Sequence, residues 1–323
     1  MVFNWLMLAH FKNPKERDDC IKHLARTYVE KNNMVFVAMF GPYISSPVTL
    51  ATVSKDGAEY TGVMKEVTGI KGTGYYTKYV PKVKKLVEAL KNNNVKIHGV
   101  LYWGHSAGPS LGDGWYHTKT FLTIMDFTKY ILKPLQPKVV IFDSCYMGVV
   151  SALYEMTEVK SILYVLASPT YHPSHSCLNT RDFGKIGTGS HDKATLAKQL
   201  KKVTCSFQEL VSPAYRCFIM IDLQKVHKLV EELQNLAYDK DTAFAFVKDT
   251  QLSKADPVTH DLYRSVKDSH VKTLIKEISK DTCGLNKCKV ARGVSIEKEF
   301  PDAHRGLYKS MKWYKKMKHF YGE

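Results

Sequence analysis

The middle of the chain reads Val139-Val-Ile-Phe-Asp143-Ser-Cys145-Tyr-Met-Gly-Val-Val-Ser-Ala-Leu-Tyr-Glu-Met156. It begins with an apolar, mostly β-branched run closed by Asp143, which predicts a buried strand. From Val149 onward there is no Gly or Pro and the apolar residues recur at helical spacing, which predicts a helix. Cys145 therefore lies where a strand leads into a helix, at the carboxyl edge of a sheet. Open α/β sheets bind their ligands at that edge.

A second apolar strand ends in a histidine. Its sequence is Ile97-His-Gly-Val-Leu-Tyr-Trp-Gly-His105-Ser-Ala-Gly108. The residues between the two strand ends are numerous enough for the crossover that joins neighbouring parallel strands. We therefore expect the imidazole of His105 and the thiol of Cys145 at adjacent strand tips. A neighbouring base or helix N-terminus activates a thiol as a nucleophile.

Each of these residues also has a purely structural explanation. A free cysteine is commonly buried as a small hydrophobic residue. His105 could simply end a strand, and Asp143 could cap the helix that follows. It is the combination at two strand tips that favours acyl-transfer chemistry.

Ser106 offers a rival nucleophile. Gly104-His-Ser106-Ala-Gly108 matches the G-x-S-x-G elbow of α/β-hydrolases, which would make the chain a serine esterase or lipase. The elbow requires a helix directly after the serine, but the sequence continues as Pro109-Ser-Leu-Gly-Asp-Gly114, which predicts a loop. We therefore favour Cys145 with His105 and keep Ser106 as the alternative.

The composition fits a large folded α/β chain without a membrane span. The chain has 323 residues, 44% of them hydrophobic, and a net charge of +16. Lysines are dense in residues 78–96 and 309–318, the second stretch alternating with aromatic residues. Such a stretch can bind nucleic acid or an acidic protein, although a solvated helix face with its aromatics in the core explains it better. A catalytically inactive binding module of this fold is the second alternative.

The cysteines predict an intracellular protein. There are seven of them, scattered along the chain, which argues against a disulfide framework and for reduced thiols. The apolar N-terminus lacks the basic leader of a signal peptide. We expect the cytoplasm of a host or source cell, or a virus particle, with secretion as the alternative.

We expect no metal and no cofactor. Cys283 and Cys288 are spaced more widely than the cysteine pairs of usual zinc sites, so zinc is the minor interpretation there. The histidines that could complete such a site are His260, His270, His304 and His319.

Strands alternate with helices along most of the chain, which predicts a largely parallel sheet covered on both faces. Beyond the two strands above, the expected strands lie at 34–40, 161–168 and 215–222. The expected helices lie at 14–31, 80–92, 124–132, 194–203, 223–237 and 263–279.

These motifs resemble the clostripain-like cysteine peptidases of the caspase, legumain and separase superfamily (clan CD). In that superfamily one strand ends in the catalytic His and the next in Asp-x-Cys, as do Gly104-His105 and Asp143-Ser-Cys145 here. Val165-Leu-Ala-Ser168-Pro and Phe218-Ile-Met-Ile-Asp222-Leu-Gln-Lys225 resemble two further family segments. The resemblance covers residues 34 to 246.

The resemblance implies a caspase-like three-layer α/β/α sandwich with a mostly parallel central sheet. We place an N-terminal helical segment at 1–32, the peptidase domain at 33–254 and a basic helical C-terminal extension at 255–323. The implied activity is that of a cysteine endopeptidase, which hydrolyses proteins or peptides through a thioester acyl-enzyme without a cofactor.

The resemblance also implies a role for each site residue. Cys145 would attack the scissile carbonyl and His105 would protonate the leaving amine. The backbone amides of Ser106 and Cys145 would bind the oxyanion. Asp143 and Ser168 would bind the substrate, with Asp143 lining an acidic pocket for Arg or Lys. The family's second acidic residue is missing here, since no Asp or Glu occurs between Glu158 and Asp182.

Overall fold

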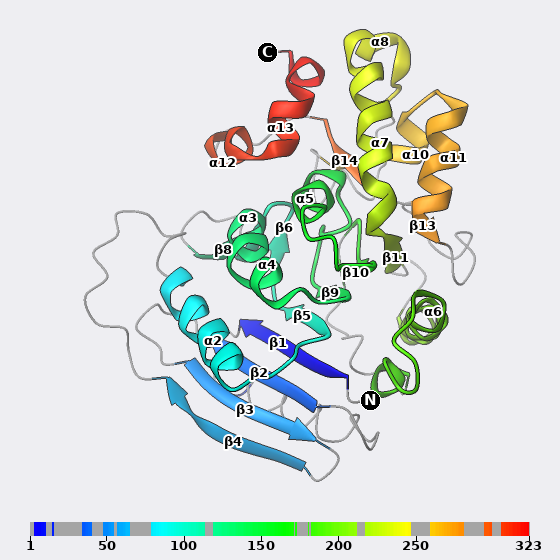
Figure 1. Ribbon diagram of the computed structural model, residues 1–323. Helices are drawn as coiled ribbons and strands as arrows, with labels where there is room; N and C mark the ends of the chain where they lie inside the picture. Colours follow the sequence, from blue (N-terminus) through cyan, green and yellow to red (C-terminus); the bar gives the residue numbers. More distant parts are fainter. Residues whose placement is uncertain are drawn as a thin grey trace.

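The computed structural model describes residues 3–10, 15, 34–40, 48–54, 57–64, 79–113, 119–170, 172, 180, 182–211, 217–246, 259–280, 294–298 and 305–322. Its centre is a nine-stranded sheet in the order β13-β11-β10-β9-β5-β1-β2-β3-β4 (Figure 1). The five middle strands run parallel, and the strands at both edges are antiparallel. The largely parallel core that the sequence predicts is therefore confirmed.

The parallel strands are short and apolar. They are β10 (Tyr164–Ala167), β9 (Val139–Asp143), β5 (Gly99–Trp103), β1 (Asn4–His10) and β2 (Met34–Phe40). Every residue of β9 is buried, which explains why this strand is a continuous apolar run: layers cover both of its faces. The edge strands are β3 (Val48–Ser54), β4 (Gly57–Met64), β11 (Ile219–Asp222) and β13 (Ser279–Lys280).

Helices cover the two faces of the sheet and bury two separate hydrophobic clusters. Helix α6 (Lys193–Leu210) packs with the 3-10 turn Phe183–Lys185 into one cluster, which includes Leu196, Leu200 and Phe207. The other cluster is lined by more helices. These are α2 (Val80–Asn92), α3 (Ile124–Phe127) with the π-helix Thr128–Leu132, α4 (Lys133–Leu135), α5 (Val150–Met156), α7 (Leu223–Leu236) and α11 (Ser269–Ile278). The result is the expected α/β/α sandwich.

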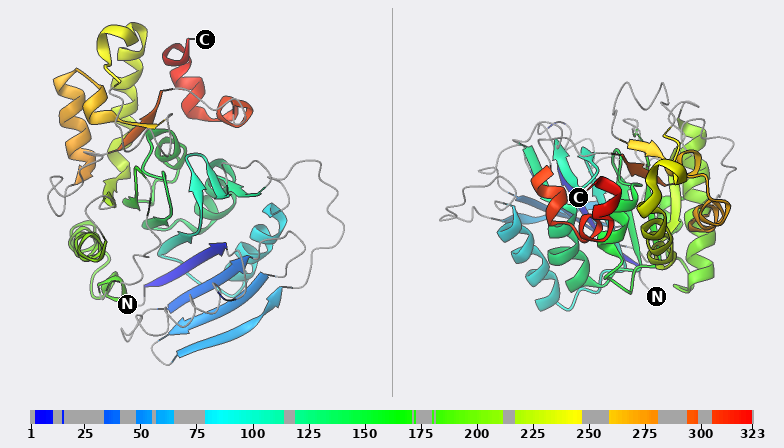
Figure 2. Two further views of the ribbon diagram at one scale, coloured as in Figure 1. Left: turned by 180° about the vertical axis from the view of Figure 1, so that it is seen from behind. Right: turned by 90° about the horizontal axis from the view of Figure 1, so that it is seen from above.

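The C-terminal residues add helices and a two-stranded sheet. Strands β12 (Thr259–Asp261) and β14 (Ser295–Glu297) pair antiparallel. The short helices are α8 (Lys240–Ala243), α10 (Leu262–Ser265), α12 (Arg305–Ser310), α13 (Lys312–Met317) and the 3-10 turn Lys318–Tyr321. Helices α12 and α13 lie at the same end of the molecule as α7 and α11 (Figure 2).

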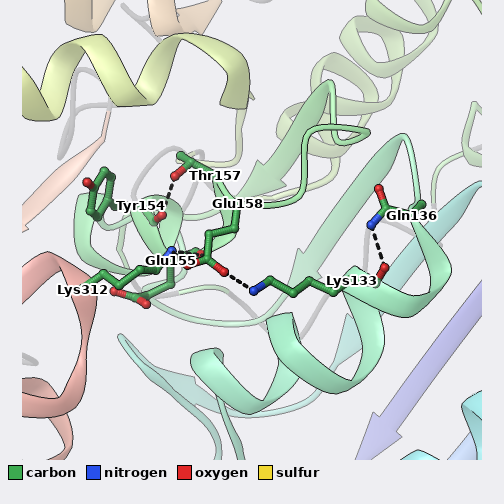
Figure 3. A network of polar contacts seen from close by, with 7 residues as sticks. All are labelled: Lys133, Gln136, Tyr154, Glu155, Thr157, Glu158 and Lys312. Carbon is green, nitrogen blue, oxygen red and sulfur yellow. Dashed lines mark hydrogen bonds and ion pairs between the residues drawn. The ribbon is translucent and has the colours of Figure 1, made fainter.

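Polar contacts join α13 to the helix that follows the central cysteine. The carboxylate of Glu155 in α5 accepts a hydrogen bond from the Trp313 backbone at 2.9 Å. Glu158 bonds both Lys133 and Lys312 (Figure 3). Within the lysine-rich stretch 309–318, Trp313 and Tyr314 are buried while Lys315 and Lys318 are exposed. The lysine-rich stretch is thus a solvated face over a packed core, the explanation favoured from the sequence.

Two expectations need correction. Residues 4–10 form β1, a central strand of the main sheet, where an N-terminal helical segment was expected. The helix expected at 14–31 lies outside the described residues except for Lys15. Cys205 and Cys217 are disulfide-bonded, so the expectation of reduced thiols is wrong for these two. Cys283 and Cys288 lie outside the described residues.

Candidate active site

The ends of β5 and β9 bring the predicted histidine and cysteine to adjacent strand tips. The two strands are parallel neighbours, and Trp103 pairs directly with Asp143. The chains stay close beyond this pair, because the Gly104 amide donates to the Asp143 carbonyl at 3.5 Å. His105 and Cys145 each follow their paired residue by two positions. They therefore occupy equivalent places at the carboxyl edge of the sheet.

Cys145 is a free, half-buried thiol with contacts to one backbone segment. Its sulfur accepts a hydrogen bond from the His172 amide at 3.3 Å and lies 3.6 Å from the His172 carbonyl oxygen. Burial raises the pKa of the thiol above its ordinary value, the His172 amide lowers it in part, and the nearby Asp143 carboxylate raises it again. The resting group at neutral pH is a thiol.

His105 lies on the exposed side of the same edge. Its carbonyl oxygen is held twice, by the Tyr102 hydroxyl at 2.8 Å and by the Gly112 amide at 2.6 Å. The backbone that carries the imidazole is therefore fixed. The chain then enters a small antiparallel sheet of β6 (Ser106–Ala107), β7 (Ser110–Asp113) and β8 (Lys119–Thr123).

Ser106 supports the cysteine tip instead of forming a nucleophile elbow. It is buried in β6, and its hydroxyl donates a short hydrogen bond to the Cys145 carbonyl oxygen. The residues after it form β6 and β7, so the helix that an elbow requires directly after its serine is missing from this described segment. The contact also ties the residue next to His105 to Cys145 itself.

Asp143 is buried beneath the two tips and bonded to a histidine. Its Oδ1 lies 2.5 Å from Nε2 of His172, and the two side chains are 1% and 4% exposed. The His172 ring stacks on Phe207 with ring centres 5.0 Å apart and contacts Phe218. The carboxylate assigned to a basic substrate side chain already has a partner within the protein.

Sequence reasoning missed His172. It lies in irregular chain after β10, and only its position five residues beyond Ala167 links it to the sheet edge. Segments with no repeat or motif give no signal of tertiary contacts. A histidine close after the Ser168-Pro169 pair is the sole hint available in the sequence.

The turn after Cys145 is tightly built. Tyr146 adopts a left-handed backbone with φ of +54°, which is unfavourable for a tyrosine, and its amide donates to the Thr170 carbonyl at 2.8 Å. The Gly148 amide donates to the Ser168 carbonyl at 2.8 Å. A Cβ added to Gly148 would lie 2.7 Å from the Pro169 nitrogen. The nucleophile turn and the segment after β10 therefore form one packed unit.

Ser168 belongs to this unit. It is buried, and its hydroxyl accepts a hydrogen bond from the Thr170 amide at 3.2 Å. Strand β14 is also bonded to this unit through Ser295. The Ser295 amide donates to the Gly148 carbonyl at 3.1 Å, and the Ser295 hydroxyl donates to the Pro169 carbonyl at 2.9 Å. The C-terminal region thus helps to hold the nucleophile turn.

Among the described residues, no cluster of three or more His, Cys, Asp or Glu side chains has the arrangement of a metal site. In the same part of the chain, no helix combines the length and the apolar character needed to cross a membrane.

Comparisons with known proteins give structural matches only. No protein-family model matches the sequence, and no curated protein sequence matches it. A secreted C11 cysteine protease from Bacteroides thetaiotaomicron, solved with an irreversible peptide inhibitor, superposes with a TM-score of 0.67 at 14% identity, covering 98% of each chain. An inactive zymogen C11 protease from Parabacteroides distasonis gives 0.66 at 12% identity over 97% of each chain.

A second structure of a secreted C11 protease from Bacteroides thetaiotaomicron gives a TM-score of 0.64 at 13% identity, covering 98% of this chain and 99% of that one. These matches extend well beyond residues 34–246, the span of the sequence resemblance, and they include most of the C-terminal region. Over almost its whole length, the chain has the caspase-like fold of the clostripain-like C11 cysteine proteases.

Proposed function

We propose that this protein is a cysteine endopeptidase with Cys145 as nucleophile and His105 as general acid and base. The observation that carries the proposal is the register of β5 and β9, which sets both residues two positions beyond one directly paired couple. The fold shared with C11 proteases supports it. Substrates would be proteins or peptides.

The chemistry follows from the two groups. His105 accepts the thiol proton as the Cys145 sulfur attacks the scissile carbonyl carbon. The tetrahedral intermediate collapses with cleavage of the C–N bond, and the imidazolium gives its proton to the leaving amine. Water, deprotonated by His105, then hydrolyses the thioester and restores the thiol.

The raised pKa of Cys145 fits this order of events. A buried thiol does not ionise by itself at neutral pH, so proton transfer must accompany substrate binding. His105 lies on the exposed side of the edge, where a bound substrate would exclude water from it. The resting enzyme would therefore react slowly with small thiol reagents.

The oxyanion would be bound by the backbone amides of Cys145 and Ser106. Main-chain donors at such a position contribute a few kcal/mol of barrier lowering in comparable sites, roughly 3 kcal/mol per donor. The Ser106 hydroxyl bond to the Cys145 carbonyl links the two residues whose amides would act in this way.

The test compares wild type with Cys145→Ala on a fluorescence-quenched denatured protein substrate. We expect cleavage by wild type and none by the variant, with equal melting temperatures. Prolonged treatment with iodoacetamide, which allows for the slow reaction of the resting thiol, should modify Cys145 as mapped by peptide mass spectrometry. Cleavage that survives in Cys145→Ala, or labelling of Ser106 by a fluorophosphonate, would instead support the serine esterase alternative.

Three finer expectations stay predictions. Asp143 and Ser168 would contribute to substrate binding, and cleavage after Arg or Lys follows only if Asp143 is accessible to the substrate. A nucleic acid or acidic protein would bind the exposed lysines. The intracellular location likewise stays a prediction, although disulfide bonds such as those of Cys205 and Cys217 are commoner in oxidising compartments.

A further inference from the structure

His172 bonds the Asp143 carboxylate, the group that the family resemblance assigns to a basic substrate side chain. Its Nε2 lies 2.5 Å from the Asp143 carboxylate, and its backbone contacts the Cys145 sulfur at 3.3 Å through the amide. One residue of the protein thus contacts both the nucleophile and the carboxylate below it. This arrangement bears on specificity, and the inference drawn from it rests on the proposed function.

The ring of His172 is fixed from several sides. It is stacked on Phe207 at an interplanar angle of 4° and packs against Phe218. Its side chain is 4% exposed. The segment that carries it is pinned through the hydrogen bond from the Tyr146 amide to the Thr170 carbonyl. Because these contacts hold the ring, we expect it to keep this position when a substrate binds.

The hydrogen bonds of the two ring nitrogens show how His172 interacts with Asp143. Its Nδ1 is buried and forms no hydrogen bond with a described residue. Nε2 therefore carries the proton that is donated to the Asp143 carboxylate. This is the donation that an arginine or lysine of a substrate would otherwise make.

We infer that His172 sets the primary specificity of this peptidase: by holding Asp143, it excludes Arg and Lys and selects an uncharged residue before the cleaved bond. A cationic side chain that enters this region finds the carboxylate occupied and must leave its own hydration without a replacement partner. Burying an uncompensated charge is strongly unfavourable. An uncharged side chain carries no such penalty.

The experiment uses fluorogenic peptides that differ only in the residue before the cleaved bond, which is Arg, Lys, Gln or norleucine. Wild type should cleave the norleucine and Gln peptides with kcat/KM about tenfold or more above the Arg and Lys peptides. His172→Ala removes the imidazole that binds the Asp143 carboxylate and should shift the Arg-to-norleucine ratio by about tenfold or more toward Arg.

Two further variants distinguish the effect of the Asp143 charge from the effect of the space that the His172 ring leaves. His172→Gln keeps a donor near the position of Nε2 and should retain the wild-type ratio. The double variant His172→Ala with Asp143→Asn has the space but lacks the charge, and should lose the shift toward Arg. The wild-type ratio requires no variant, so the inference is tested even if His172→Ala does not fold.

Preference of wild type for Arg or Lys would overturn the inference, and so would a His172→Ala ratio equal to that of wild type. Failure of the proposed function looks different. In that case no peptide is cleaved, or cleavage persists in Cys145→Ala. Cysteine-dependent cleavage with a basic preference would leave the peptidase assignment intact and remove only the role of His172.

Discussion

The two ends of the central strands carry buried histidines in opposite electrostatic settings. At the carboxyl ends, His172 lies against Phe207 and bonds the Asp143 carboxylate at 2.5 Å. At the amino ends, His98 and His191 pack together with ring centres 5.0 Å apart, beside the ring of Phe3. Their charged neighbours there are the cations Lys96 and Lys138.

The different surroundings of these histidines indicate which end of the sheet is suited to catalysis. Nδ1 of His98 accepts a hydrogen bond from the Asn4 amide at 3.1 Å, so the ring must stay unprotonated at that atom. Burial first, and then His191 and the two lysines, lower the pKa of His98 to about 4. The amino end therefore stabilises a neutral, inert pair. The carboxyl end combines a carboxylate, a histidine and a thiol around an accessible edge.

The largest expected effect is at the accessible edge. His105→Ala removes the proposed general base and should lower kcat/KM by about 10³-fold, within the range seen for such groups. Its exposed position predicts little change in stability. Peptide hydrolysis measures kcat/KM, and thermal unfolding measures the stability of the variant.

His98→Asn is the matched control at the opposite end. It should change stability while kcat/KM stays within about twofold, since sites far apart are usually independent. An equal loss of activity in both variants would contradict the division between the two ends.

The next effect is acid destabilisation from the amino end. A histidine with a lowered folded-state pKa stabilises the fold fully above its unfolded pKa of 6.5, and this contribution is lost as the pH falls toward about 4. The free energy of unfolding should drop by about 3 kcal/mol across that window from His98 alone. Urea unfolding at a series of pH values measures it.

His98→Asn should flatten this dependence, because the asparagine side-chain oxygen can still accept the hydrogen bond from the Asn4 amide but does not titrate. His191, whose pKa is also lowered by burial, would supply the remaining slope. An unchanged acid slope in the variant would show that the amino-end pair is not the cause.

Gly148→Ala should disturb the nucleophile turn. The added Cβ would lie 2.7 Å from the nitrogen and 2.9 Å from the Cα of Pro169, which are backbone atoms that cannot rotate away. We expect a loss of about 2 kcal/mol in stability and a fall in kcat, as for overpacked cores. Gly306→Ala in α12 is the control, because nothing lies within 4 Å of its Cβ. Similar results for both would refute the packing argument.

The smallest effect is expected for Ser106→Ala. The variant loses the hydroxyl bond to the Cys145 carbonyl, a contact worth about 1 kcal/mol, and keeps the backbone amide. Activity should fall by about fivefold. Complete inactivation would revive Ser106 as nucleophile.

Local patterns predicted the parts of the fold that depend on local physics. Helix α2 spans the expected residues because Pro81 suits its first turn and its apolar residues, Val83, Val87 and Leu90, share one buried face. Strand β9 is a buried apolar run that ends at Asp143, as expected. The parallel pairing of β5 with β9, which brings the ends of these two strands together, was also expected.

Features set by tertiary contacts escaped prediction. Strand β1 is a continuous apolar run at the start of the chain, and such a run resembles a targeting segment as much as a central strand. His172 meets Asp143 across 29 positions of sequence, from a segment without periodicity. The positions of Cys205 and Cys217 in the sequence do not show that each of them takes part in a disulfide bond.

The bridge between Val149 and Ser295 has a consequence for biogenesis. During synthesis, the strands that carry His105 and Cys145 emerge long before Ser295, which supplies hydrogen bonds to Gly148 and Pro169. The nucleophile turn therefore gains these hydrogen bonds only after Ser295 has been synthesised. A nascent chain that has not yet reached Ser295 therefore lacks two of the hydrogen bonds that hold the proposed nucleophile turn.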